Sequence, residues 1–172
     1  MTRQRGVPPE LRAYVNAAAT RFIRDFNSQP LEIGVVDGVV WAIARSPVVG
    51  VNGYAMVPGE KHPWSQGWPE EVDFNDVFNV HGGITAAFHP WLGFDTGHAD
   101  DLWPPEFDPH ALSSRLLMSP NAIHWTVSAV SAEARKLARQ VAKLARDPLW
   151  RTRSRFAELD VQQLNTPEGE ML

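Results

Sequence analysis

With 172 residues, of which 44% are hydrophobic and 21% charged, the chain has the size and composition of one globular domain. The net charge is -4, the mean hydropathy is -0.27, and no apolar run approaches the roughly 18 residues of a membrane span, so we expect a soluble protein. The chain has no cysteine, which excludes disulfides, thiolate metal sites and a thiol nucleophile, so any metal must be bound by imidazole and oxygen ligands.

The N-terminal third predicts one helix followed by strands. The basic residues 1–6 are not followed by the apolar stretch of an export signal, so a cytoplasmic location is expected. Pro8-Pro9 and the apolar spacing after it predict a helix over about 9–26. Two β-rich runs, 31–36 and 39–44, flank Asp37-Gly38 and predict a tight hairpin. Residues 48–57 predict a turn at Asn52-Gly53 and a further strand that ends at Pro58-Gly59.

The middle of the chain has a different composition. Residues 58–120 hold eight of the fourteen prolines, five of the six histidines and four of the seven tryptophans, which favours long ordered loops. Within this segment, residues 76–81 and 84–88 resemble strands and are separated by Gly82-Gly83. They predict a second hairpin.

The last predicted element is an amphipathic helix over 127–145, where apolar residues recur at steps of three and four. Thr126 is the expected N-cap, and Asp147-Pro148 the expected end. Residues 156–172 are polar and unpatterned, and we expect a frayed tail beyond an ordered core of about 9–150. The prediction is a single α+β domain over 1–172, with a small, mainly antiparallel sheet, an N-terminal helix and a C-terminal amphipathic helix.

The first motif that can carry chemistry is Val80-His81-Gly82-Gly83-Ile84-Thr85. A histidine ends a predicted strand, and the two glycines would allow a ligand to approach the backbone closely. A hairpin turn with an incidental histidine explains the same residues equally well.

The second motif extends from Trp91 to Asp101 and places Asp95, His98 and Asp101 at intervals of three. In a 3₁₀ or α-helical turn these side chains would converge. Aspartate and histidine are ligands for zinc, manganese and iron, and a carboxylate beside an imidazole also orients a general base. The alternative is a helical turn capped by Asp95 or Thr96.

The other histidines are less informative. His62, in the loop sequence His62-Pro63-Trp64, would add a third imidazole to a site or lie on the surface. His89 and His110 have no identifiable partner. The motifs G-x-S-x-G, G-x-x-x-x-G-K-S/T, H-E-x-x-H and G-x-G-x-x-G are absent, so the common hydrolase, NTPase, metalloprotease and dinucleotide-binding classes have no support.

The order of these motifs resembles a family of small, largely uncharacterised proteins encoded by bacteriophages and prophages. The resemblance covers about 45–145 and is carried by Asn52-Gly53-Tyr54, Val57-Pro58, His62-Pro63, the V-H-G-G-I-T run, the G-F-D-x-x-H-x-x-D pattern of 93–101 and Leu137-Ala138-Arg139-Gln140. Family members often read Gly-His-Pro at 61–63 and have a cysteine where this chain has Thr96, which argues against an essential thiol. The resemblance implies a phage accessory protein in the host bacterial cytoplasm and no particular reaction. It also favours one site formed by His62, His81, Asp95, His98 and Asp101.

Two functions follow, and the sequence leaves open whether the protein is an enzyme. The first is a hydrolase of a phosphate-containing or nucleotide-like small molecule, which would use either a divalent metal or acid/base side chains; the sequence leaves the cofactor open. Its catalytic groups or metal ligands would be His81, Asp95, His98 and Asp101, and its substrate-binding residues would be His62, Gly82, Gly83, Thr85 and Trp91. The alternative is a non-enzymatic protein that sequesters a host protein or a small signalling molecule through a surface formed by Trp64, Trp68, Trp91 and Trp103.

Charge is unevenly distributed along the chain. Residues 60–110 carry ten acidic side chains against Lys61, whereas 133–155 carry eight basic ones against Glu133 and Asp147. We interpret the basic segment as a solvated helix face or as a complement to the acidic segment. Nucleic-acid binding is the less favoured interpretation; it would use Arg135, Arg139, Lys143, Arg151, Arg153 and Arg155. No membrane partner is expected, and the oligomeric state is left open.

Overall fold

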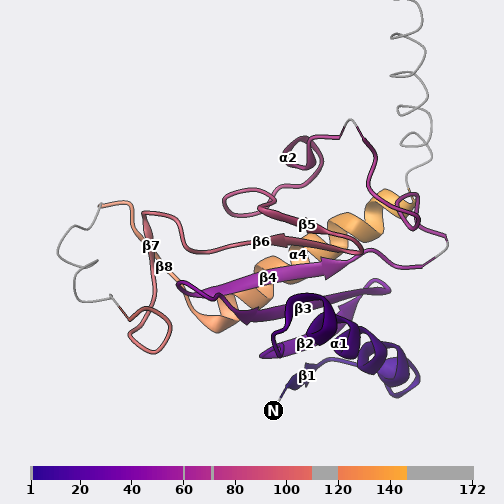
Figure 1. Ribbon diagram of the computed structural model, residues 1–172, viewed down its shortest axis with the longest axis horizontal. Coiled ribbons are helices and arrows are strands. Elements are labelled where there is room, and N and C mark those ends of the chain that lie inside the picture. The colour runs from indigo at the N-terminus through magenta and orange to yellow at the C-terminus, as the bar shows by residue number, and fades with distance from the viewer. Residues whose placement is uncertain (1, 60, 71, 110–119, 147–172) are drawn as a thin grey trace, which may run out of the picture.

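The computed structural model describes residues 2–59, 61–70, 72–109 and 120–146 (Figure 1). A six-stranded sheet lies between two long helices, with one helix packed on each face. The predicted α+β class, with its mainly antiparallel sheet and its N-terminal and C-terminal helices, is confirmed. In the described part of the chain, no helix is long and apolar enough to cross a membrane.

The strand order in the main sheet is β1-β2-β3-β4-β6-β5. Only β1 and β2 pair in parallel, and the other neighbours are antiparallel. The strands are β1 Arg3–Arg5, β2 Glu32–Val36, β3 Val39–Arg45, β4 Val51–Met56, β5 Ala86–Phe88 and β6 Trp91–Phe94.

The first predicted helix and hairpin are both confirmed. A 3₁₀ turn, η1 (Pro9–Leu11), leads into α1 (Arg12–Phe26), whose apolar stripe is buried against the sheet. Strands β2 and β3 are joined at Asp37-Gly38, where both residues have positive φ angles of 52° and 81°. This is the backbone that a two-residue hairpin turn requires.

The turn expected at Asn52-Gly53 is wrong, because both residues lie inside β4. The chain turns earlier, where the Ser46 N–H donates to the Gly50 carbonyl over 3.1 Å. A Cβ at position 53 would lie 2.4 Å from the Phe94 ring and 3.3 Å from Ala134. Gly53 therefore permits close helix–sheet packing instead of a turn.

The hairpin expected across Gly82-Gly83 is also wrong. Strand β5 pairs with β6 across the cis peptide His89-Pro90, and the chain before the glycines forms the short helix α2 (Phe74–Val77). The Asn75 side chain accepts a hydrogen bond from the Ile84 N–H over 2.7 Å. Side-chain hydrogen bonds therefore take the place of the expected ladder around this turn.

The predicted amphipathic helix is confirmed as α4 (Val127–Arg146), and its sheet-facing side is buried. The Thr126 hydroxyl accepts the Ala129 N–H over 3.1 Å, as expected of an N-cap. The predicted helix end at Asp147-Pro148 and the tail 156–172 lie outside the described residues.

Tryptophans fill much of the core on both faces of the sheet. Trp64 and Trp103 are buried on the α4 side and Trp91 on the α1 side, while Trp68 is half-buried. These four tryptophans therefore do not form the exposed contact surface that the alternative function requires.

A second, two-stranded parallel sheet lies beside one end of the main sheet (Figure 1). It pairs β7 (Asp101–Leu102) with β8 (Ile123–His124). The pairing brings Asp101 close to Trp125, the residue that follows β8.

Candidate metal centre

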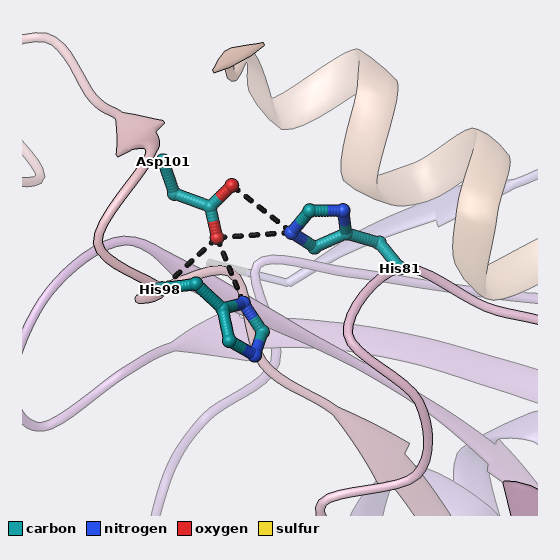
Figure 2. A group of neighbouring side chains, drawn as sticks. All are labelled: His81, His98 and Asp101. Atoms are coloured by element: carbon teal, nitrogen blue, oxygen red, sulfur yellow. Dashed lines mark hydrogen bonds and ion pairs between the residues drawn. The ribbon is translucent and has the colours of Figure 1, made fainter. Parts of the chain in front are cut away.

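Two imidazoles and one carboxylate form a single cluster (Figure 2). His81 Nε2 lies 3.0 Å from both oxygens of Asp101, and His98 Nδ1 lies 3.0 Å from Asp101 Oδ2. One atom from each residue can be chosen so that the three lie within 4.8 Å of one another. The V-H-G-G and G-F-D-x-x-H-x-x-D motifs therefore meet in space.

Asp101 is the buried centre of the cluster, with 1% of its side chain exposed. Its carboxylate accepts the Trp125 indole N–H over 2.8 Å and the His98 backbone N–H over 3.0 Å. Burial alone would raise the pKa of Asp101, but these two donors and the two imidazoles outweigh it and hold the pKa below its usual value. Asp101 is therefore ionised at neutral pH.

The imidazoles form the outer part of the cluster. The exposed fraction of the side chain is 22% for His81 and 39% for His98. Without a metal, the nitrogen that each ring turns toward Asp101 carries the proton, because an ionised carboxylate only accepts hydrogen bonds. His98 Nε2 points away from Asp101 (Figure 2) and lies 3.8 Å from Asp95 Oδ1. Asp95 thus lies at the rim of the cluster.

His81 is fixed by helix α4 as well as by Asp101. Its backbone N–H donates to Glu133 Oε1 on α4 over 3.0 Å, and its ring meets the Trp125 ring edge-on at a centroid distance of 4.9 Å. The imidazole is therefore held from its backbone and from one face before any ligand binds.

The two glycines after His81 make room for side chains of the same chain. Gly82 has a φ of 64°, and a Cβ there would lie 2.1 Å from the His98 ring. Gly83 has a φ of 80°, and a Cβ there would lie 2.3 Å from Asn75 Oδ1. The sequence predicted that a ligand would approach the backbone of these glycines. In the structure, the side chains of His98 and Asn75 occupy that space.

The 95–101 segment converges without forming the expected helical turn. Asp95 Oδ1 accepts the Gly97 N–H over 3.1 Å, and the Asp101 N–H donates to the His98 carbonyl over 2.9 Å. Thr96 is buried between these turns, where its hydroxyl donates to the Val51 carbonyl over 2.8 Å. Two successive tight turns therefore bring His98 and Asp101 together.

His62 lies apart from the cluster and packs against α4. Its Nδ1 accepts the Trp64 N–H over 3.1 Å, so Nε2 carries the proton and donates to the Val141 carbonyl over 3.2 Å. Burial lowers the pKa of His62, only partly opposed by the Val141 carbonyl. Since Val141 is two helical turns beyond Glu133, about 12 Å along α4, His62 does not join His81 and His98.

The other predicted binding residues also lie outside the cluster. The Trp91 ring is 1% exposed and packs edge-on against Phe22 of α1, on the opposite face of the sheet from α4. Thr85 begins the β5–β6 hairpin, where its N–H donates to the Gly93 carbonyl over 2.9 Å. His89 makes a structural contact of 3.0 Å from Nε2 to the Trp64 carbonyl, and His110 lies outside the described residues.

Sequence reasoning missed Trp125 and Glu133. Both contact the cluster from positions far along the chain, 24 residues from Asp101 and 52 from His81. A tryptophan before an N-cap and a glutamate on a helix have ordinary structural explanations, and no spacing rule links either to the two motifs.

The chain matches no protein-family model, no curated protein and no solved structure. The function must therefore be argued from the cluster itself.

Proposed function

We propose that His81, His98 and Asp101 bind a divalent metal ion and that the protein is a metal-dependent hydrolase. The observation that carries the proposal is the position of one buried carboxylate oxygen, Asp101 Oδ2, 3.0 Å from both imidazoles. Two imidazole nitrogens and one carboxylate form a ligand set that zinc and iron accept in proteins.

The spacing of the donor atoms suits a metal ion. Ligands at 2.0–2.1 Å from a tetrahedral zinc lie about 3.3 Å from one another, close to the 3.0 Å contacts between Asp101 and the imidazoles. Binding would require the two facing ring nitrogens to lose their protons, while Asp101 is already ionised. The three donor atoms lie within 4.8 Å of one another, whereas two ligands of one zinc ion are at most about 4.1 Å apart, so the partly exposed rings would move together on binding.

Exposure favours a catalytic site over a structural one. A structural zinc is commonly enclosed by four protein ligands, whereas a catalytic zinc has three and keeps a position for water. Three ligands are found among the described residues, and His98, the most exposed, lies toward solvent. A divalent ion held by His81, His98 and Asp101 would supply an activated water as the nucleophile for hydrolysis.

A phosphate-containing or nucleotide-like substrate remains a prediction from the sequence. The described side chains around the cluster include the carboxylates of Asp95 and Glu133, and Glu133 is paired with Lys136 at 2.9 Å. A phosphate ester would therefore depend on the metal for charge neutralisation. On the sequence resemblance alone, we also propose that the protein is a phage-encoded accessory protein of the bacterial cytoplasm.

The test combines metal analysis with hydrolysis assays on the wild type, His81→Ala, His98→Ala and the matched control His124→Ala. His124 is an exposed histidine on β8 that is not part of the cluster. We expect about one zinc, manganese or iron ion per chain in the wild type and the control, and loss of the ion in both cluster variants. We also expect chelator-sensitive hydrolysis of chromogenic phosphomonoesters or phosphodiesters.

Two outcomes would contradict parts of this proposal. A wild-type protein that binds no divalent metal, even after incubation with zinc or manganese, would reject the metal centre. A protein that binds metal but hydrolyses no ester would reject the hydrolase while retaining the metal centre.

A further inference from the structure

Trp125 contacts two of the three proposed metal ligands. Its indole N–H donates to Asp101 Oδ1 over 2.8 Å, and its ring packs edge-on against His81 at 4.9 Å and 71°. Trp125 is 8% exposed, so this hydrogen bond is shielded from water. A buried hydrogen bond to a charged group is among the stronger ones in proteins.

The indole is itself held in one orientation. The Trp125 backbone N–H donates to the Leu102 carbonyl over 2.8 Å, and Thr126 then caps α4. The ring is also nearly parallel to that of Trp103, with centroids 6.4 Å apart. Trp103 is fixed in turn by its N–H, which donates to the Thr96 carbonyl over 2.9 Å. Rotation of the Trp125 ring would break its hydrogen bond to Asp101 and its packing against His81 and Trp103.

The indole hydrogen bond affects which oxygen of Asp101 is available to a metal. His98 contacts Oδ2 through both its ring and its backbone N–H, while the indole engages Oδ1. His81 Nε2 lies 3.0 Å from both oxygens, so Oδ2 is the oxygen that both imidazoles contact, and Oδ1 is the one that the indole N–H also occupies. Partners of this kind orient metal ligands and raise metal affinity.

We propose that Trp125 is a positioning residue of the metal centre: its indole N–H holds Asp101 so that Oδ2 alone binds the ion. This inference rests on the metal centre proposed above. A one-oxygen carboxylate with two imidazoles favours transition metals such as zinc over calcium, which takes more oxygen ligands and often both oxygens of a carboxylate.

The test is Trp125→Phe, which removes the N–H donor and keeps an aromatic ring. We expect zinc affinity, measured by competition with a chromophoric chelator, to fall about 10- to 100-fold. The visible absorption of bound Co²⁺ should also change, because it reports ligand number and geometry. A purely structural role would lower stability without altering that spectrum.

Trp91→Phe is the matched control. It makes the same change at a buried tryptophan on the other face of the sheet, whose indole nitrogen has no hydrogen-bond partner among the described residues. We expect it to keep wild-type zinc affinity and the wild-type Co²⁺ spectrum. If Trp125→Phe binds zinc within about twofold of the wild type, with an unchanged spectrum, the inference is wrong while the metal centre stands. If the wild type itself binds no metal, both the metal centre and the positioning role of Trp125 are rejected.

A measurement on the wild type covers the case in which Trp125→Phe does not fold. In proton–nitrogen NMR of tryptophan-labelled protein, the Trp125 indole N–H should exchange slowly with solvent and shift when zinc is added. The Trp91 signal should not move with zinc. A Trp125 signal that exchanges as fast as an exposed indole, or is unmoved by zinc, would overturn the inference.

Discussion

The first third of the chain and the middle segment reach their structures by different means. In residues 2–57, the strands from β1 to β4 pair backbone with backbone in a regular register. In the described residues between 61 and 109, the β5–β6 hairpin is regular, but much of the remaining chain is held by side chains. Asn75 binds the Ile84 N–H, Glu133 the His81 N–H, and Asp101 the His98 N–H. One of these side chains, Asp101, is also the centre of the candidate site, and another, Glu133, holds the backbone of His81.

The largest effect predicted from this comparison is that of Asp101→Ala. It removes the acceptor of a buried indole N–H and a backbone N–H, and of both imidazoles, at the junction of the two sheets. We expect the free energy of unfolding to fall by about 3 to 5 kcal/mol. Urea unfolding would measure this, with Asp100→Ala as the control, because Asp100 is the exposed neighbour. Equal stabilities for the two variants would show that Asp101 does not organise the segment.

The next largest loss of stability is expected from replacing Gly82, beside the site, and it can be compared with the loss from replacing Gly38 in a regular hairpin. Gly82→Ala places a Cβ 2.1 Å from the His98 ring at a φ of 64°, whereas Gly38→Ala places one in open space at a φ of 81°. Both variants strain the backbone, but only the first also displaces His98. We expect losses of about 2 to 3 kcal/mol for Gly82→Ala and about 1 kcal/mol for Gly38→Ala, measured by urea unfolding. Zinc affinity should fall only in Gly82→Ala, and equal affinities would refute the close fit between the turn and His98.

The same contrast explains how much of the fold could be predicted from the sequence. Apolar periodicity and Asp37-Gly38 identify α1, α4 and the β2–β3 hairpin, because each depends on residues near one another in the chain. Asn52-Gly53 predicts a turn and Gly82-Gly83 a hairpin, and both predictions are wrong for the same reason. Gly53 is needed for close packing, and Gly82 and Gly83 are needed for positive φ angles in a turn that side chains hold. In the sequence, such glycines look the same as the glycine of a hairpin turn. Only the packed structure separates these roles.

The site was predicted in part for a similar reason. The spacing His98-x-x-Asp101 is local, and two tight turns bring those residues together much as a helical turn would have done. Trp125 and Glu133 depend on β7–β8 pairing and on the packing of α4, which no local pattern encodes. For His62 the sequence predicted a site residue or a surface residue, whereas in the structure it is buried and packs against α4.

A smaller loss of stability is expected at Asn75. It tests whether this one side chain takes the place of the strand pairing expected across Gly82-Gly83. Asn75→Ala removes the acceptor of the Ile84 N–H and should destabilise the protein by about 0.5 to 1.5 kcal/mol, because this hydrogen bond is exposed. Asn79→Ala is the control, because that exposed residue bonds to Gln140 through its backbone, which the substitution retains. Urea unfolding of both variants provides the measurement. A loss at Asn79 as large as that at Asn75 would mean that the turn is held mainly by other contacts.

The smallest predicted effect is a pH dependence at His62, a residue of the middle segment that lies outside the site. Its neutral ring accepts from the Trp64 N–H and donates to the Val141 carbonyl, and burial lowers its pKa. Below about pH 6.5 the unfolded chain therefore binds a proton that the folded protein disfavours, so the free energy of unfolding should fall as pH decreases from that value. Asp101, whose pKa is lowered from 3.8, contributes only at more acidic pH.

Urea unfolding of the wild type and His62→Gln between about pH 5 and pH 8, with a chelator present, measures this contribution. A glutamine side chain does not titrate, so the variant should lose less stability between about pH 6.5 and pH 5 than the wild type does, although it starts less stable above that range. Zinc affinity at pH 8 should be unchanged, because His62 contacts the far part of α4 and not the cluster. Parallel pH curves for the two proteins would mean that His62 takes up its proton equally in both states, and a loss of zinc binding would return His62 to the site.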